Sequence, residues 1–214
     1  MSRFAAPGWR LAGSFVSWTA FTFFFLGLYQ AAGLVIGLGG FCASGGPYVI
    51  ETECPDSVIL FAPGGIFGMI AAVAVAIFFA RGFGVSLLSW AWPILFVGLG
   101  IQFLLGAVSG IGIVSNIICA VLFIAMGLAP IWFTVSSKLL ASTLLGSTNL
   151  MGQHFVSEST PRPYLGVPRR PDDAEQVPAT TGDWALSLGL CAVAIALGAY
   201  LSYAAFTALA ATPA

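Results

Sequence analysis

Residues 82–137 read GFGVSLLSWAWPILFVGLGIQFLLGAVSGIGIVSNIICAVLFIAMGLAPIWFTVSS and contain no Asp, Glu, Lys or Arg. One helix needs about 20 apolar residues to cross a hydrocarbon core of roughly 30 Å. The run is therefore too long for one span and long enough for two. Its centre, residues 106–112, holds the Gly and Ser residues of a turn. The sequence thus predicts a pair of transmembrane helices here.

Three further uncharged runs predict the other spans, lying between Arg10 and Glu51, between Asp56 and Arg81, and after Asp183. The resulting fold is an all-α integral membrane bundle of about five helices. The predicted spans are 12–40, 58–80, 84–106, 112–136 and 184–208. A membrane β-barrel would instead show short alternating segments.

The composition supports this class. The chain of 214 residues is 59% hydrophobic and only 7% charged, and its mean hydropathy is +1.00. A soluble domain carries about 25% charged residues. A conventional soluble enzyme, a disordered chain and a small disulfide-framework protein are therefore excluded.

The basic residues predict the orientation. With five spans, one side holds the N-terminus, the turn near residue 82 and the segment 138–183. All seven basic residues fall on that side: Arg3, Arg10, Arg81, Lys138, Arg162, Arg169 and Arg170. Because positive residues favour the cytoplasmic side, we expect the N-terminus inside and the C-terminus outside. Spans rich in Ala and Gly, with Arg in excess of Lys, favour a bacterial gene and hence a multi-pass protein of the inner (plasma) membrane.

The loops divide the chain into three parts. Residues 1–137 form a four-span bundle with an outer loop at 42–56, and residues 184–214 form the fifth helix. In the segment 138–183, the leucines from Leu139 onward, with Met151 and Phe155, predict a short interfacial helix. From Ser157 to Gly182 five prolines and mixed charges predict an extended or partly disordered linker.

Two cysteines stand at the ends of the outer loop. We expect Cys42 and Cys54 to form a structural disulfide, since the outer side of a membrane permits one. A redox-active pair is the alternative. That role needs a second pair of cysteines as a relay, whereas Cys119 and Cys191 are single residues in different spans.

The predicted spans contain no Asp, Glu, Lys, Arg or His. This argues against a proton pump or an ion-coupled transporter, because intramembrane charges mark those functions. The one histidine, His154, is expected at the membrane surface. We predict no metal ion, cofactor or nucleic-acid partner, and an enzymatic role is less favoured than a non-catalytic one.

Small residues predict where helices pack. They recur at helical spacing in the first three spans, at Gly33, Gly37, Gly64, Gly68, Ala72, Ala76, Gly98 and Gly106. Such stripes let helix backbones approach closely. The strongest uncharged polar candidates are Gln30, Gln102 and Asn116, which either line a polar cavity or form hydrogen bonds between helices.

These features together predict a non-catalytic subunit or scaffold within a larger membrane assembly. Its partners would be the lipid bilayer and either other membrane subunits or further copies of the chain. The alternative is a transporter or channel for an uncharged or apolar molecule, for which Gln30, Gln102 and Asn116 should converge on one cavity. A third hypothesis is an enzyme acting on a lipid or a thiol.

Overall fold

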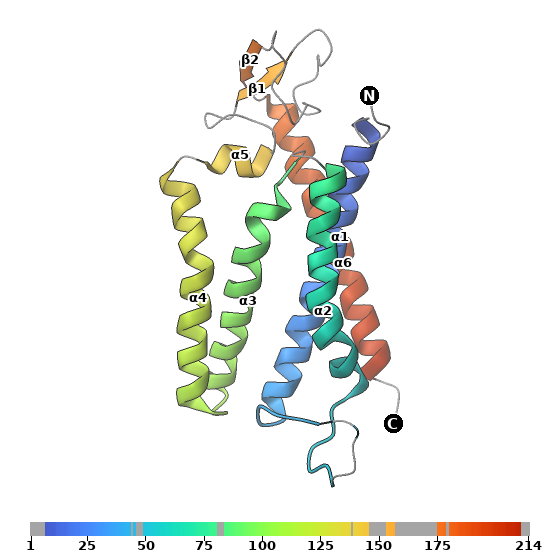
Figure 1. Cartoon of the computed structure of the whole chain (residues 1–214), viewed down its shortest axis with the longest axis vertical. Helices are drawn as coiled ribbons and strands as arrows, with labels where there is room; N and C mark the ends of the chain where they lie inside the picture. Colours follow the sequence, from blue (N-terminus) through green and yellow to red (C-terminus); the bar gives the residue numbers. More distant parts are fainter. Residues whose placement is uncertain are drawn as a thin grey trace.

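The computed structural model is a bundle of long helices (Figure 1). It describes residues 7–43, 45, 49–80, 84–137, 139–145, 153–156, 175–178 and 180–210.

Among these residues, five helices are long and apolar enough to cross a membrane, which confirms the five predicted apolar helices. They are α1 (Pro7–Gly37), α2 (Asp56–Val75), which continues as the π-helical turn η2 (Ala76–Ala80), α3 (Leu87–Val108), α4 (Ile113–Ser136) and α6 (Thr181–Ala210). The apolar runs become helices because a helix satisfies its own backbone hydrogen bonds without water.

The helices alternate in direction between two ends of the bundle. One end, here called the N-terminal end, holds the starts of α1 and α6 and the end of η2 (Figure 1). The other, here called the disulfide end, holds the loop after α1 and the end of α6. The start of α1 and the end of α6 therefore lie at opposite ends, as an odd number of alternating helices requires.

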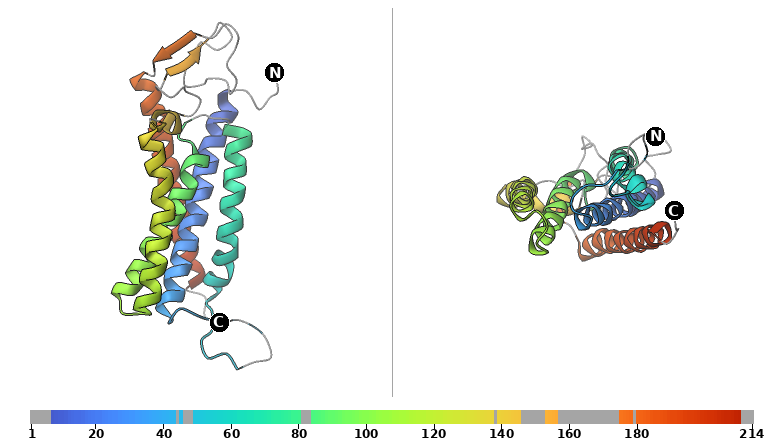
Figure 2. Two further views of the ribbon diagram at one scale, coloured as in Figure 1. Left: turned by 60° about the vertical axis from the view of Figure 1, so that its left-hand side comes forward. Right: turned by 90° about the horizontal axis from the view of Figure 1, so that it is seen from below.

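Helix α1 is the centre of the bundle. Seen along the bundle axis, it lies between α2 and α6, with α3 beyond it and α4 outermost (Figure 2). Helix α1 packs extensively against α2 and α6 and also contacts α3, whereas α4 packs mainly against α3. The α3–α4 hairpin is thus joined to the other helices chiefly through α1.

The buried core follows α1. Trp18 and Phe21 of α1 pack with Met69 of α2 and with Cys191 and Ala194 of α6. The Trp18 indole Nε1–H donates a hydrogen bond to the Val85 carbonyl at 2.9 Å, so its polar atom is satisfied. In lipid, such close packing and interhelical hydrogen bonds hold helices together, because lipid tails are as apolar as the side chains.

Two helices begin earlier than the sequence predicts. Helix α1 starts at Pro7, where proline suits a first helical turn, and α6 starts at Thr181. Arg10 and Asp183 therefore lie inside these helices and not beyond them. The predicted boundaries had been placed after each charge, and the structure instead buries both charges at the N-terminal end.

The segment after α4 differs in part from the expectation. Only α5 (Leu140–Leu145) is helical among its described residues, and it lies across the N-terminal end (Figure 1). Phe155, predicted in the interfacial helix, is instead in β1 (Gln153–Val156), which pairs antiparallel with β2 (Glu175–Pro178). Aromatic and β-branched residues such as those of β1 favour strands. Met151 and most of the proline-rich stretch, 157–174, lie outside the described residues.

Candidate functional site: a furrow along α1

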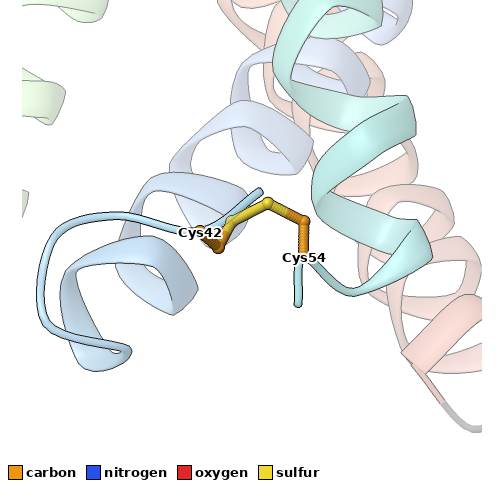
Figure 3. The surroundings of a disulfide bond; sticks show 2 residues. All are labelled: Cys42 and Cys54. Carbon is orange, nitrogen blue, oxygen red and sulfur yellow. A yellow bond between two sulfur atoms is a disulfide. The ribbon is translucent and has the colours of Figure 1, made fainter. Parts of the chain in front are cut away.

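The outer loop is closed by the predicted disulfide. Cys42 and Cys54 are bonded, with their Cα atoms 5.0 Å apart (Figure 3). The backbone beside the bond is also paired, since Ala43 N–H donates to Thr52 O and Cys54 N–H to Ala43 O, each at 3.0 Å. These bonds hold together the two arms of the loop, the second of which leads into α2.

The two remaining cysteines form no second pair. Both are free, with Cys119 on α4 and Cys191 on α6, and these helices are not neighbours in the bundle (Figure 2). A redox-active role for Cys42 and Cys54 would need a second cysteine pair as a relay, and Cys119 and Cys191 do not form one. Furthermore, no three His, Cys, Asp or Glu side chains within the described ranges are grouped to hold a metal ion.

Four of the predicted packing glycines lie against neighbouring helices. A Cβ added to Gly68 or Gly98 would meet the ring of Phe24 or Phe25, respectively, on α1. A Cβ at Gly33 would meet the Gln102 amide, and one at Gly106 would lie 2.7 Å from Ile36. Each glycine therefore allows an approach that a larger residue would prevent.

The other predicted packing positions differ among themselves. Ala72 is buried in the core, and Ala76 packs against it. Gly37 and Gly64 face open space, with nothing within 4 Å of an added Cβ. On α2 the tight position is Gly65, where a Cβ would lie 2.8 Å from Leu28 Cβ and 3.1 Å from Phe24 O.

This one-residue difference can be tested. We expect Gly65→Ala to lower the free energy of unfolding by about 1–3 kcal/mol, because overpacking forces backbones apart. The matched variant Gly64→Ala should be neutral or slightly stabilising, because Ala favours a helix by about 1 kcal/mol over Gly. Unfolding in mixed micelles measures both, and equal effects would contradict the observed helix register.

The three polar candidates have separate surroundings. Gln30 Nε2 donates to Leu26 O at 3.1 Å and to Ser202 Oγ of α6 at 3.4 Å. Gln102 lies beside Gly33, and Asn116 Nδ2 donates to Ile111 O at 2.7 Å within the α3–α4 turn. Asn116 lines the hollow at the disulfide end, whereas Gln30 is hydrogen-bonded to Ser202 of α6.

The structure shows a different concave feature, a furrow whose floor is α1 and whose walls are α2 with η2 and α3. Three hollows follow one another along it, and α2 and α3 make few direct contacts. The N-terminal hollow has a volume of about 260 Å³, the middle hollow about 480 Å³ and the disulfide-end hollow about 590 Å³. Leu28 lines both the middle and the disulfide-end hollows, so these two are adjacent.

The middle hollow is apolar. Its lining residues come from all three helices and are Phe21, Leu28, Ile66, Met69, Ile70, Val73, Ala91, Trp92, Leu95 and Leu99. The only polar group among these side chains is the Trp92 indole N–H, which donates to Met126 O of α4 at 3.3 Å. This part of the furrow therefore suits a hydrocarbon chain or an apolar side chain.

The N-terminal hollow is lined by buried hydroxyl groups. Ser14 and Ser17 of α1 are 2% and 1% exposed, and both line this hollow. Ser17 Oγ donates to Ser14 O at 3.0 Å.

Glycine keeps space beside the Ser14 hydroxyl. Gly84 has a φ of +68°, a conformation that glycine adopts without strain. A Cβ there would lie 3.2 Å from Ser14 Oγ and 3.7 Å from Ser187 Oγ of α6. Ser187 itself donates to Leu144 O of α5 at 2.7 Å. Hydroxyls of α1 and α6 thus both lie beside the Gly84 position.

Two buried charges flank the same region. Arg10 is 2% exposed, and its Nε donates to Ala80 O, on a residue that lines the N-terminal hollow, at 3.4 Å. Asp183 is 1% exposed and caps α6, since its Oδ2 accepts from Thr180 N–H at 2.7 Å and Thr180 Oγ1–H at 2.9 Å. Such reciprocal capping satisfies amides that the first helical turn leaves free.

Sequence reasoning missed this polar group. Arg10, Ser14 and Ser17 are spaced i, i+4 and i+7, which places them on one face of a helix. Asp183 and Ser187 repeat the i, i+4 spacing on α6. The spacing could therefore have indicated a polar helix face, but the predicted spans began after Arg10 and Asp183 and left both charges out. His154 lies in β1, an element that contributes no residue to the three hollows of the furrow.

The side chains that line the furrow suit binding better than they suit catalysis. The furrow holds one small hollow with three serines in its lining and a larger apolar one, and the described residues that line them include no nucleophile paired with a base. Comparison of the chain with protein-family models, curated proteins and solved structures found no match.

Proposed function

We propose that the protein is a non-catalytic integral membrane subunit or scaffold that packs within a larger membrane assembly. The observation that carries this proposal is the open bundle: α4 packs mainly against α3, and the α3–α4 hairpin meets the other helices chiefly through α1. A bundle complete in itself would cover α4 on more than one side. The partners would be other membrane subunits or further copies of this chain.

The orientation and location belong to the same proposal. The N-terminal end would face the cytoplasm and the disulfide end the outside of a plasma membrane, as in a bacterial inner membrane. The disulfide supports this orientation, because such bonds persist in oxidising compartments. The basic residues of the sequence support it independently.

The transporter alternative is less well supported. It required Gln30, Gln102 and Asn116 to share a cavity, and in the structure they have separate neighbours. We therefore retain the subunit role as the function that the geometry supports best.

A substitution on α4 tests the assembly. Val121 on α4 and Val193 on α6 are similarly exposed, at 63% and 61%. If α4 is the contact with partners, Val121→Trp should reduce the partner chains that co-purify in mild detergent at least fivefold, because the indole prevents close packing. Val193→Trp, the matched control, should leave them unchanged.

Sizing of the native protein provides the second measurement. The wild-type chain should elute as a complex larger than one copy. A compact monomer with no co-purifying chain would contradict the proposal, and so would equal losses for the two tryptophan variants.

A further inference from the structure

We propose that the Cys42–Cys54 disulfide is a redox-sensitive latch on a flap that covers the disulfide-end hollow. The flap is residues 39–42, which connect the end of α1 to the bond. While the bond is intact, the flap covers the mouth of the hollow, and reduction of the bond lets the flap swing away. This device goes beyond the subunit role and does not depend on it.

The bond connects two walls of this hollow, whose volume is about 590 Å³. Residues 39–41 line it from one side and stand directly before Cys42. Val58 and Ala62 line it from α2, which begins two residues after Cys54 (Figure 3). Separating the two cysteines therefore frees these two walls to move apart.

Two glycines give the flap a hinge. Gly39 and Gly40 have φ values of +99° and +93°, a conformation that glycine adopts without strain. Their N–H groups donate to Ile36 O at 3.0 Å and to Val35 O at 2.9 Å, respectively, at the end of α1. Hinges are typically a few residues at the end of an element that absorb a change in backbone angles. The flap can therefore turn at these glycines while α1 stays in place.

The far end of the flap is held at the disulfide. Beyond Gly40, the described backbone hydrogen bonds run to the other arm of the loop, from Ala43 N–H to Thr52 O and from Cys54 N–H to Ala43 O. None of the described hydrogen bonds joins the flap to the α3–α4 turn. After reduction, only this short bridge opposes the entropy that the loop gains when it opens.

Phe41 is the residue that covers the mouth. It lines the hollow, yet 62% of its surface is exposed, so it lies between the hollow and the surroundings. Ser115 and Asn116 line the same hollow from α4. When Phe41 moves away, water reaches these polar side chains, and the covered hollow becomes an open one.

The reductant is a protein dithiol on the disulfide side of the membrane. Both cysteines are half-buried, so a thiolate can reach one of the sulfur atoms. Its attack breaks the S–S bond and forms a mixed disulfide, which the second thiol of the reductant then displaces. Two electrons and two protons thus pass to Cys42 and Cys54, and the dithiol becomes a disulfide. A redox enzyme must pass its electrons on, whereas this switch keeps them, so it needs no relay.

Alkylation of an introduced cysteine tests the flap. Ala62→Cys places a thiol in the wall of the hollow, in the full-length chain in lipid nanodiscs. The probe is a sulfonated maleimide, which is charged and reaches thiols from water, and peptide mass spectrometry measures its rate at each cysteine. We expect the rate at position 62 to rise at least tenfold after reduction by a phosphine that is removed before labelling. The native Cys119, on α4 outside the hollow, should change less than twofold.

A variant of the flap separates its movement from a general loosening of the loop. With the bond intact, Phe41→Ala should already raise the rate at position 62 at least fivefold, because the ring no longer covers the mouth. The matched control is Phe67→Ala, at an equally accessible phenylalanine of α2 that is 71% exposed and lies outside the hollow. This control should leave the rate unchanged.

Reduction and folding are checked in the same samples. Alkylation of Cys42 and Cys54 verifies that the bond is reduced, and circular dichroism verifies the helices. Val35→Cys, in the α1 wall of the hollow, is a second reporter and should follow the same pattern. An unchanged rate at both reporters in the reduced, folded protein would overturn the proposal, and so would equal rates in the two phenylalanine variants.

Discussion

Replacing Gly198 by leucine should lower the free energy of unfolding by about 3 kcal/mol, at the upper end of the overpacking range. A Cβ at this position would lie 2.5 Å from the Thr19 carbonyl oxygen and 2.9 Å from Thr22 Cβ. The first of these atoms belongs to the backbone of α1, which cannot rotate away as a side chain can. The whole of α6 must therefore move outward, and the packing of Ala194 against α1 would be lost.

The matched control is Gly189→Leu on the same helix. Nothing lies within 4 Å of an added Cβ at Gly189, so this variant should retain the stability of the wild type. Unfolding by a denaturing detergent, followed by circular dichroism, compares the two. Similar stability of both variants would mean that α1 and α6 do not cross at Gly198.

Removing the disulfide should produce the second large effect. The Cys42→Ser, Cys54→Ser double variant should lose about 3 kcal/mol, the chain-entropy value for a ring of this size. Residues 42 and 54 are separated by 12 positions, and freeing them lets the outer loop sample many more conformations. The start of α2 should then fray, since the arm of the loop that leads into it is no longer held.

Reductant separates this effect from a general cost of substitution. A reducing agent should lower the melting temperature of the wild type towards that of the double variant and leave the double variant unchanged. Cys119→Ser, at a free cysteine on α4, should behave as the wild type with and without reductant. Insensitivity of the wild type to reductant would contradict a stabilising role for the bond.

The sequence was sufficient to predict the five long helices, because the uncharged runs are long and are bounded by charges. It was less reliable at the ends of α1 and α6. Arg10 and Asp183 both lie in the first turns of their helices. Arg10 Nε donates a hydrogen bond to the Ala80 carbonyl of η2, and Asp183 caps α6. A rule that ends a span at each charge can anticipate neither a partner 70 residues away nor a cap within the first helical turn.

The packing register was harder to predict than the helices. Gly64, Gly65 and Gly68 all lie within two turns of α2. A four-residue repeat in the sequence fits the face with Gly64 and Gly68, but it does not show which face of α2 contacts α1. The contacting pair is Gly65 and Gly68, since both meet the Phe24 and Leu28 region of α1. Which face is used depends on the partner helix, and that information is not local.

The furrow could not be predicted from the sequence at all. It exists because α3 reaches the rest of the bundle through α1 while making few contacts with α2. Any sequence of five apolar spans is compatible with several neighbour arrangements. Only the three-dimensional order of the helices brings Val73 of α2 and Ala91 of α3 to the same hollow.

The central place of α1 also constrains how the protein is made. Helix α1 is synthesised first, yet one of its faces packs against α6, the last span to be made. During synthesis that face, which includes the Thr19 and Thr22 positions opposite Gly198, has no partner until nearly the whole chain has emerged. Contacts between such distant segments form late, since a long loop must first close. Completion of the bundle is therefore coupled to completion of the chain, and a product lacking α6 would leave its first helix unpartnered on that side.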